Sequence, residues 1–335
     1  MDRRTVLGLG AAALTALSVK EAKAEAMQQD GSISTDPKEV LALWPATPPG
    51  GEGVTLTAEV VERSTDTAAF NDRYVHNIGT PLLTVFRPAK PDGSAVVIAP
   101  GGGYVREVLD KEGFEAARRF NESGVTVFVM RYRLPAEGWK NGADVPLQDA
   151  QRAVRLVRAH AAHYGLDPAR VGILGFSAGG HVAASLATRF AEKVYEPVDA
   201  ADALEARPAF AGLMYPVITM GDTAHTGSRR SLLPVTATQA ELDHYSCEKR
   251  VTAATSPCFL SYALDDTTVP PIGNSVAMYL ALAAAKIPAE IHGFAEGGHG
   301  FGLRGAVGKP CAAWPELFLT WGTRGGWFKN GTARV

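Results

Sequence analysis

The stretch that most limits the possible folds of this chain is the pentapeptide GFSAG at residues 175–179, together with its flanks. It follows a short apolar run with the composition of a β-strand (170–174) and precedes a run of small residues typical of a helix (180–187). A strand, a G-x-S-x-G turn and a helix in this order predict a nucleophile elbow, which lifts a serine hydroxyl clear of the sheet. Glycines are expected on both sides of Ser177, because a Cβ there would press on the neighbouring strand and helix.

Short runs rich in β-forming residues alternate with helical patterns from about residue 54 onward. The predicted strands are 54–62, 82–87, 95–99, 125–131, 171–175, 210–215, 258–263 and 289–294. The predicted helices are 147–164, 275–286 and 315–324, and in the first of them apolar residues recur at spacings of three and four. This alternation predicts an α/β protein whose mostly parallel sheet carries helices on both faces. No helix is predicted between the first two strands, which favours an antiparallel start.

The 335 residues of the chain could form one large domain or two small ones. The sequence contains no internal repeat and no low-complexity linker, so we predict a single α/β domain at 54–335. A polar, irregular stretch around 216–256 interrupts the alternation, and we expect it to be an insertion over one end of the sheet. Residues 25–53 are polar and then rich in proline, and we expect them to form an N-terminal arm along the surface.

Residues 1–24 have the composition of a signal peptide rather than of folded structure. Arg3 and Arg4 precede an apolar stretch (6–19) and a small-x-small cleavage pattern at 22–24. The paired arginines favour the twin-arginine export route, and a Sec signal that carries two arginines is the closer alternative. A membrane anchor is disfavoured, because the apolar stretch is shorter than the roughly 20 residues that span a bilayer. We therefore expect a periplasmic or secreted protein.

Charge and cysteine content exclude several classes of partner and cofactor. The formal net charge of −2 indicates neither a nucleic-acid partner nor an anionic membrane surface. Cys247, Cys258 and Cys311 are too few for a disulfide framework, although an exported protein could form one bridge among them. Their spacing resembles no metal site, and no two histidines stand four residues apart, as in a helical metal-binding pair. We therefore predict no catalytic metal.

An acyl-transfer serine needs a base that takes its proton and a carboxylate that orients the base. The base candidate is His299, in a glycine-rich loop after the last predicted strand. Asp265 and Asp266 directly follow the strand at 258–263, and ligand-facing groups of open α/β sheets lie just beyond such strand ends. Either aspartate could be the acid, with a turn-stabilising role for the other. With Ser177, these candidates follow the α/β-hydrolase order Ser, Asp, His.

Of the eight histidines, His299 alone combines a late position, a loop after a strand and flanking glycines. His181 lies on the helix that follows the elbow, and we expect it to have a packing or supporting role. The other histidines lie on a surface helix or show no comparable context, and they are His76, His160, His163, His225, His244 and His292.

Donors for the developing oxyanion are predicted in the run PGGGY at 100–104, directly after the strand at 95–99. Glycines allow backbone N–H groups to point into a cavity without obstruction by a Cβ. Gly102 and Gly103 would donate, together with the N–H of Ala178. A phosphate loop is excluded because no Lys-Ser or Lys-Thr follows, and no G-x-G-x-x-G fingerprint stands at the first strand-to-helix turn. We expect no cofactor.

Several segments together resemble the serine esterases of the α/β-hydrolase superfamily. Residues 98–104 (IAPGGGY) resemble their HGGG-type oxyanion motif, with Pro100 where many members have histidine. The match is completed by the segments 129–134, 144–153, 175–181, 266–270 and 298–301. It extends from about residue 40 to the C-terminus, and it is most similar to secreted acetylesterases that resemble acetylxylan esterases and often carry the name xylanase. The change at Pro100 removes a side-chain donor but leaves the glycine amides.

The resemblance implies an α/β-hydrolase fold, with a mostly parallel eight-stranded sheet between two layers of helices. It implies that Ser177 is the nucleophile, His299 the general base and Asp266 the orienting acid. It thereby favours Asp266 over Asp265. The oxyanion hole would be formed by the three amides named above.

By this resemblance the protein is an exported serine carboxylesterase. It would remove acetyl and other short acyl groups from plant cell-wall polysaccharides or oligosaccharides, so its partner would be an acetylated carbohydrate. The residues alone indicate only ester hydrolysis. The alternative is a peptidase or amidase of the same fold, of the dipeptidyl-peptidase or arylformamidase type. A glycosidase needs two carboxylates flanking a cleft, and no such pair has supporting context. The polysaccharide, the acyl-length limit and the oligomeric state stay open.

Overall fold

The computed structural model describes residues 36–329, and the predicted signal peptide at 1–24 lies outside them. Its main sheet has eight strands in the order β1-β4-β7-β5-β8-β9-β10-β11. In that order they are Val40–Ala42, Leu82–Phe86, Thr126–Arg131, Ala95–Ala99, Val171–Phe176, Ala211–Met214, Cys258–Ala263 and Ala289–Phe294. The first two pairings are antiparallel and the other five are parallel. The predicted mostly parallel eight-stranded sheet is confirmed.

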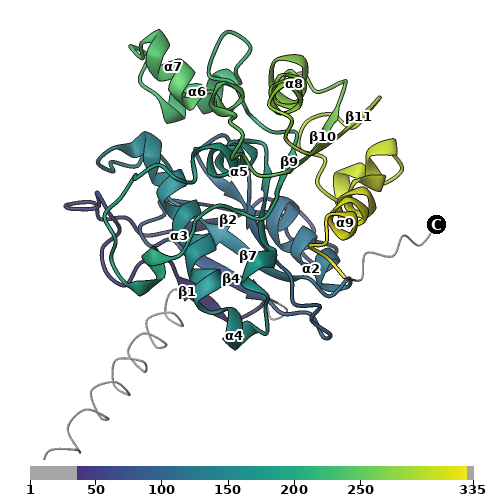
Figure 1. Cartoon of the computed structure of the whole chain (residues 1–335), viewed down its shortest axis with the longest axis horizontal. Helices are drawn as coiled ribbons and strands as arrows, with labels where there is room; N and C mark the ends of the chain where they lie inside the picture. Colours follow the sequence, from purple (N-terminus) through teal and green to yellow (C-terminus); the bar gives the residue numbers. More distant parts are fainter. Residues whose placement is uncertain (1–35, 330–335) are drawn as a thin grey trace, which may run out of the picture.

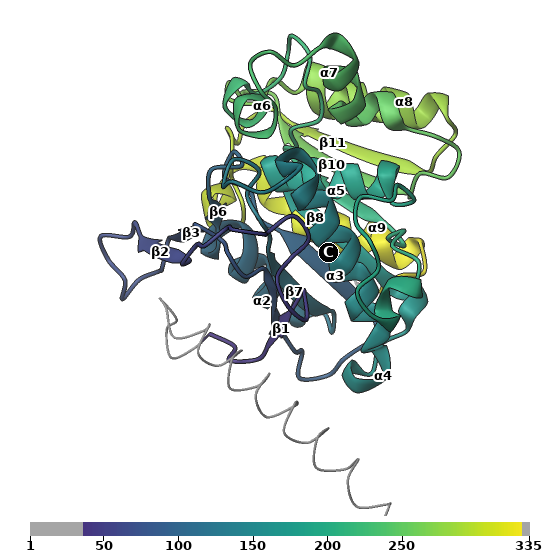
Figure 2. The same cartoon turned by 90° about the vertical axis from the view of Figure 1, so that its left-hand side faces the viewer.

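Helices cover both faces of this sheet (Figures 1 and 2). Their bounds are α2 Glu115–Asn121, α3 Val145–Ala159, α4 Ala161–Tyr164, α5 Ala178–Arg189, α6 Thr226–Leu232, α7 Gln239–Tyr245, α8 Ala277–Ala284 and α9 Trp314–Arg324. Alternate side chains of a strand point to opposite faces. In β5, Val97 packs into the core shared with α3, α5 and α8, whereas Val96 and Ile98 pack into the core shared with α2 and α9. The molecule is therefore the expected three-layer sandwich.

The N-terminal part of the main sheet differs from the prediction. The strand predicted at 54–62 is reduced to β2 (Glu59–Glu62), which lies in a separate three-stranded sheet with β3 (Arg73–His76) and β6 (Glu107–Val108). Figure 2 shows this small sheet standing out beside the main one. The outer residues of β2 are exposed glutamates, so the strand has too little apolar surface for a place in the buried sheet.

The edge position of the main sheet is taken instead by β1, which falls within the residues expected to form a surface arm. β1 pairs antiparallel with β4, and the following Leu43 and Trp44 are buried. The Trp44 indole N–H donates to Asp149 of α3 at 2.7 Å. The arm prediction is therefore wrong for this part of the chain, because its apolar residues are needed to cover the sheet edge.

The predicted helices form with altered ends. The pattern at 147–164 becomes α3 and α4, which are separated at His160. The pattern at 275–286 becomes a π-helical turn followed by α8. The stretch at 216–256 was expected to be irregular, but it contains α6 and α7. Figure 1 shows both helices at the top of the molecule, beyond α5.

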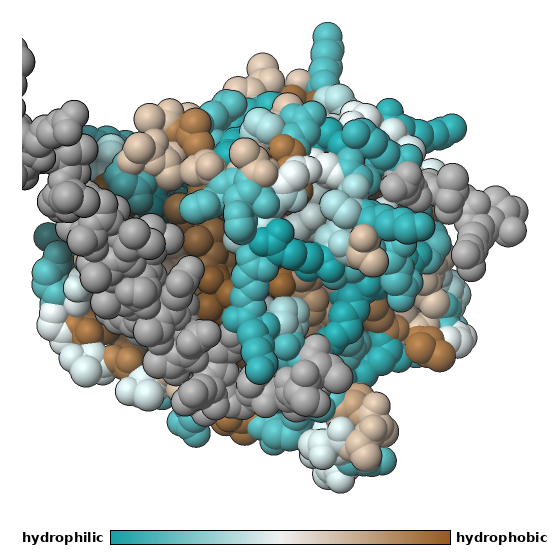
Figure 3. Space-filling model, turned by 90° about the horizontal axis from the view of Figure 1, so that it is seen from below, coloured by the Kyte–Doolittle hydropathy of each residue, from teal (hydrophilic) through white to brown (hydrophobic). Residues whose placement is uncertain are grey.

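Among residues 36–329, no helix combines the length and the apolar character needed to cross a membrane. The view from below shows hydrophilic side chains over much of the surface, with apolar groups between them (Figure 3). Cys247, Cys258 and Cys311 are all buried and all unpaired, so the three thiols form no disulfide with one another.

Candidate active site

Ser177 occupies a strained turn between β8 and α5. Its backbone has φ 52° and ψ −117°, a conformation that non-glycine residues rarely adopt. Two backbone hydrogen bonds hold it there, because the Ser177 N–H donates to the Met214 carbonyl (3.0 Å) and its carbonyl accepts from the Val217 N–H (2.9 Å). Strain of this kind persists only where the surrounding structure fixes it, and it is concentrated at functional sites.

Steric contacts explain why glycine is needed at both ends of the pentapeptide. A Cβ on Gly175 would lie 2.0 Å from the Gly179 carbonyl oxygen, and a Cβ on Gly179 would lie 2.1 Å from the Ala99 carbonyl oxygen. Both contacts are far shorter than any real Cβ contact, and both involve backbone that cannot rotate away. The close approach of β8, α5 and the end of β5 therefore depends on these two glycines.

The structure brings Ser177, His299 and Asp266 together from three different strand ends. The Ser177 Oγ lies 2.8 Å from Nε2 of His299, and Nδ1 of His299 lies 2.7 Å from Oδ2 of Asp266. Ser177 and Asp266 are both buried, and the His299 side chain is 19 % exposed. The spacing allows the Ser177 hydroxyl to donate to Nε2 while Nδ1–H donates to the carboxylate, as a general-base relay requires.

The second oxygen of Asp266 is also occupied. Its Oδ1 accepts the backbone N–H groups of Thr268 and Val269, each at 2.9 Å. The carboxylate therefore stabilises its own turn while it bonds the imidazole, and its orientation is fixed from both sides.

Asp265, the alternative acid, has a different position. It is exposed, and its Oδ1 accepts the Gly298 N–H at 2.8 Å, which lowers the pKa of its carboxyl. This bond holds the glycine-rich loop directly before His299. The aspartate expected to stabilise a turn thus supports the histidine loop, and the neighbouring Asp266 contacts the imidazole.

The predicted oxyanion loop lies beside the serine. Gly102 has φ +139° and Gly103 has φ +69°, and a Cβ on Gly102 would lie 2.2 Å from a backbone oxygen. Both glycines line a cavity of about 370 Å³ together with Ser177 and His299. Ala178 is the first residue of α5, where backbone N–H groups are not used within the helix. The arrangement can therefore offer amide donors to an anion formed at Ser177.

Glu112 and Tyr215 connect the two loops of the site. The Glu112 carboxylate accepts the Gly101 N–H (2.9 Å) with one oxygen and the Tyr215 hydroxyl (3.0 Å) with the other. The Tyr215 oxygen accepts the Gly302 N–H (3.1 Å), and its ring packs edge-on against His299, with 5.2 Å between ring centroids. Sequence reasoning missed both residues, because neither belongs to a motif and their contacts join distant segments.

His225 also lines the cavity beside Ser177, although its sequence context indicated no role. Its Nδ1 accepts the Ser228 N–H at 3.2 Å, so the imidazole caps the start of α6. Burial, and then the nearby His299, lower the pKa of His225. A neutral ring that accepts at Nδ1 carries its proton on Nε2. The H-x-x-S spacing was the only available signal.

His181 has the supporting role expected for it. It is buried, with Nδ1 2.7 Å from the Tyr104 hydroxyl and Nε2 2.7 Å from the Tyr245 carbonyl oxygen. The carbonyl can only accept, so Nε2 carries the proton and Nδ1 accepts from Tyr104. Burial in this neutral form lowers the pKa of His181 to about 4.

This shift predicts an acid-sensitive contribution to stability. The unfolded histidine has a pKa of 6.5, so the contribution is fully present above pH 6.5 and declines as the pH falls toward 4. Between pH 7.5 and pH 5 the wild-type free energy of unfolding should fall by about 2 kcal/mol more than that of His181→Gln. Urea unfolding at both pH values measures the difference. The exposed His163→Gln serves as the control, and an equal fall in wild type and His181→Gln would contradict the assignment.

A family model and several known proteins match this chain in sequence. The family model BD-FAE matches residues 83–282. The chain is 38% identical over 205 residues to endo-1,4-beta-xylanase B of Butyrivibrio fibrisolvens, a match that covers 61% of this chain and 32% of that protein. It is 32% identical over 230 residues to an acetylxylan esterase of Xylanibacter ruminicola, covering 67% of this chain and 44% of the other. The chain thus spans less than half the length of these curated relatives.

Solved structures match over much more of their length. An acetyl ester-xyloside bifunctional hydrolase from Caldicellulosiruptor lactoaceticus superposes with a TM-score of 0.69 at 29% identity, covering 89% of this chain and 100% of that one. The carboxylesterase Cest-2923 from Lactobacillus plantarum gives a TM-score of 0.60 at 25% identity, covering 81% of this chain and 98% of the other.

Proposed function

The chain belongs to the BD-FAE family of α/β-hydrolases, and we propose that it is a serine esterase that removes acetyl groups from cell-wall polysaccharides or their oligosaccharides. The observation that carries this proposal is the relay of Ser177, His299 and Asp266 beside a cavity lined by Gly102 and Gly103. The similar proteins named for esterase activity support hydrolysis of carboxylic esters.

The proposed reaction begins at Ser177. Its Oγ attacks the acetyl carbonyl while Nε2 of His299 takes the hydroxyl proton, and Asp266 stabilises the imidazolium through Nδ1–H. When the tetrahedral intermediate collapses, the C–O bond to the sugar breaks and the sugar oxygen takes the proton from His299. Water, deprotonated by the same imidazole, then attacks the acetyl-serine and releases acetate. No cofactor is needed to balance these steps.

The oxyanion of the tetrahedral intermediate needs hydrogen-bond donors. Gly101 cannot serve it, because its N–H already donates to Glu112. We assign the role to the amides of Gly102, Gly103 and Ala178, where each well-placed donor contributes roughly 3 kcal/mol to the transition state. Tyr215 and Glu112 tie the oxyanion loop to the histidine loop, so both halves of the site keep a fixed spacing.

Acetylated carbohydrate is the substrate class that the relatives support. One is named an acetylxylan esterase and another an acetyl ester-xyloside hydrolase. We expect the purified protein to release acetate from acetylated xylan faster than from acetylated pectin, and to show little activity on aminoacyl amides. Acetate release from these substrates, measured side by side at equal protein concentration, tests the proposal. Faster cleavage of the aminoacyl amides would show instead that the protein is an amidase.

We also propose that the protein acts outside the cytoplasm, on the strength of the paired arginines and the cleavage pattern within residues 1–24. An Arg3→Lys, Arg4→Lys variant should accumulate in the cytoplasm with its N-terminus uncleaved. Cell fractionation with N-terminal sequencing measures this. A variant exported as well as wild type would indicate the Sec route instead.

A further inference from the structure

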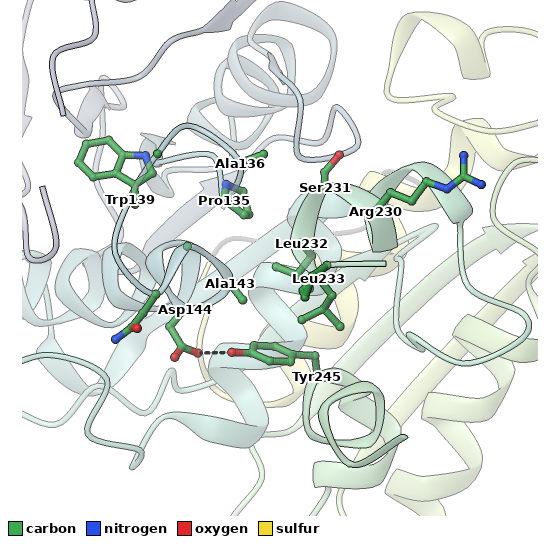
Figure 4. Close-up of a pocket in the computed structure, with 14 residues that line it drawn as sticks. Pro135, Ala136, Trp139, Ala143, Asp144, Arg230, Ser231, Leu232, Leu233 and Tyr245 are labelled. Atoms are coloured by element: carbon green, nitrogen blue, oxygen red, sulfur yellow. Dashed lines mark hydrogen bonds between the residues drawn. The ribbon is translucent and has the colours of Figure 1, made fainter. Parts of the chain in front are cut away.

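A second cavity, of about 500 Å³, is shown in Figure 4. It lies between the segment that follows β7 and the end of α6, with Pro135 and Ala136 from the first and Leu233 from the second. Ser231 of α6 lines both cavities, so the two meet at this residue. A ligand bound at Ser177 and long enough to reach Ser231 would therefore meet the lining of the second cavity.

The lining of the second cavity mixes two kinds of surface. Asn141, Asp144, Ser231 and Tyr245 offer hydrogen-bonding groups, while Trp139 and Leu233 are among the apolar ones. The charge of Asp144 is matched by the Arg189 guanidinium at 3.2 Å. The exposed Arg230 also lines the cavity and adds a cationic donor to it. A ligand with many hydroxyls and apolar C–H faces fits such a lining, because its hydroxyl oxygens can also accept hydrogen bonds from Arg230. A long acyl chain would favour a uniformly apolar pocket, and a nucleic acid a basic one.

The base of the second cavity is fixed to the catalytic machinery. The Tyr245 hydroxyl donates to Asp144 Oδ1 at 3.1 Å, the bond drawn in Figure 4. The Tyr245 carbonyl accepts from His181 of α5, and His181 bonds Tyr104 beside the glycines of the oxyanion loop. This chain of contacts holds the distance between the two cavities constant, and preorganisation of that kind favours binding of a ligand that spans both.

We propose that the second cavity binds the sugar residues next to the acetylated one, so that the enzyme acts on acetylated oligosaccharide or polysaccharide rather than on small acetate esters. This inference rests on the proposed function and extends it from the acetyl group to the chain that carries it. The binding energy of the distant sugars is then available to hold the reacting ester in place. A small aryl acetate fills only the catalytic cavity and gains nothing from the second one.

Two substitutions change the second cavity without touching the first. Ala136 is an exposed turn residue on its wall, and Ala136→Trp fills part of the space. Asn141 has φ +56°, so Asn141→Gly removes the amide while glycine keeps that backbone conformation without strain. Ala253→Trp is the matched control, since Ala253 is also an exposed alanine in a turn but lines neither cavity.

The test compares kcat/KM on acetylated xylo-oligosaccharides with kcat/KM on p-nitrophenyl acetate. Ala136→Trp should lower the first value about tenfold and leave the second within about twofold of wild type. Asn141→Gly should lower the oligosaccharide value about fivefold, the effect of one lost hydrogen bond. Xylotetraose, titrated by calorimetry, should bind wild type and Ala253→Trp and bind Ala136→Trp more weakly.

The possible outcomes separate the two proposals. Full oligosaccharide activity in both cavity variants would overturn the sugar site and leave the esterase assignment standing. Wild-type protein that cleaves p-nitrophenyl acetate but not the acetylated oligosaccharides would overturn the proposed substrate, and this inference with it. If Ala136→Trp loses both activities equally, the tryptophan has disturbed the catalytic loops. The proposal is then tested by Asn141→Gly: a lower kcat/KM on the oligosaccharides alone supports the sugar site, and an unchanged value overturns it.

Discussion

Replacing Ser177 with alanine is expected to lower kcat for p-nitrophenyl acetate by at least about 10⁴-fold. The reason is that Oγ is the atom that forms the acyl-enzyme in the proposed reaction, and nothing else in the relay can take its place. The fold should survive. Alanine keeps the backbone bonds to Met214 and Val217 that hold the turn, and the partner that it leaves, His299, is partly exposed. Steady-state kinetics and thermal unfolding of the same preparation measure both effects.

The same variant separates esterase from glycosidase chemistry. The relative from Butyrivibrio fibrisolvens is named a xylanase, and this chain covers 32% of it. A glycosidase that uses two carboxylates would not depend on Ser177. Release of reducing sugar from xylan that is equal in wild type and Ser177→Ala would show a second activity. Near wild-type cleavage of p-nitrophenyl acetate by a folded Ser177→Ala protein would end the assignment of the nucleophile.

Much of the fold could be predicted because the pattern of the central strands is strong. β5, β7, β8 and β10 are almost continuously apolar, as strands buried on both faces must be. The strands at the edges of the sheets were harder to predict. β1 has three residues, too few for a periodic pattern, and only its pairing with β4 makes it a strand. β2 shows β-type residues, but its flanking glutamates direct it to a small exposed sheet.

The residues of the site also fall into those that local sequence predicts and those that it does not. The serine, the acid and the base each follow a strand, and parallel strands bring their carboxyl ends to one edge of the sheet. Local sequence was therefore enough to propose them. Glu112 and Tyr215 could not be found in that way, because their roles depend on hydrogen bonds between segments about 100 residues apart in the chain. The choice between Asp265 and Asp266 came from family resemblance, since both follow the same strand.

Asp266→Asn should also lower kcat by about 10⁴-fold, with little change in KM. The Thr268 and Val269 amides donate to Oδ1, so the asparagine carbonyl takes that position and its NH₂ group faces Nδ1 of His299. An NH₂ group can only donate, and Nδ1 must then accept. The ring proton moves to Nε2, the atom that has to take the proton of Ser177. The imidazole keeps its place but is held in the wrong tautomer.

Asp265→Asn is the matched control for this substitution. The Asp265 carboxylate accepts the Gly298 N–H, and an asparagine carbonyl can accept the same bond. We therefore expect a loss of about tenfold or less, through looser positioning of the loop before His299. Steady-state kinetics of the two variants on p-nitrophenyl acetate give the comparison. A larger loss in Asp265→Asn than in Asp266→Asn would move the acid to Asp265, because only the residue that orients the imidazole can set its tautomer.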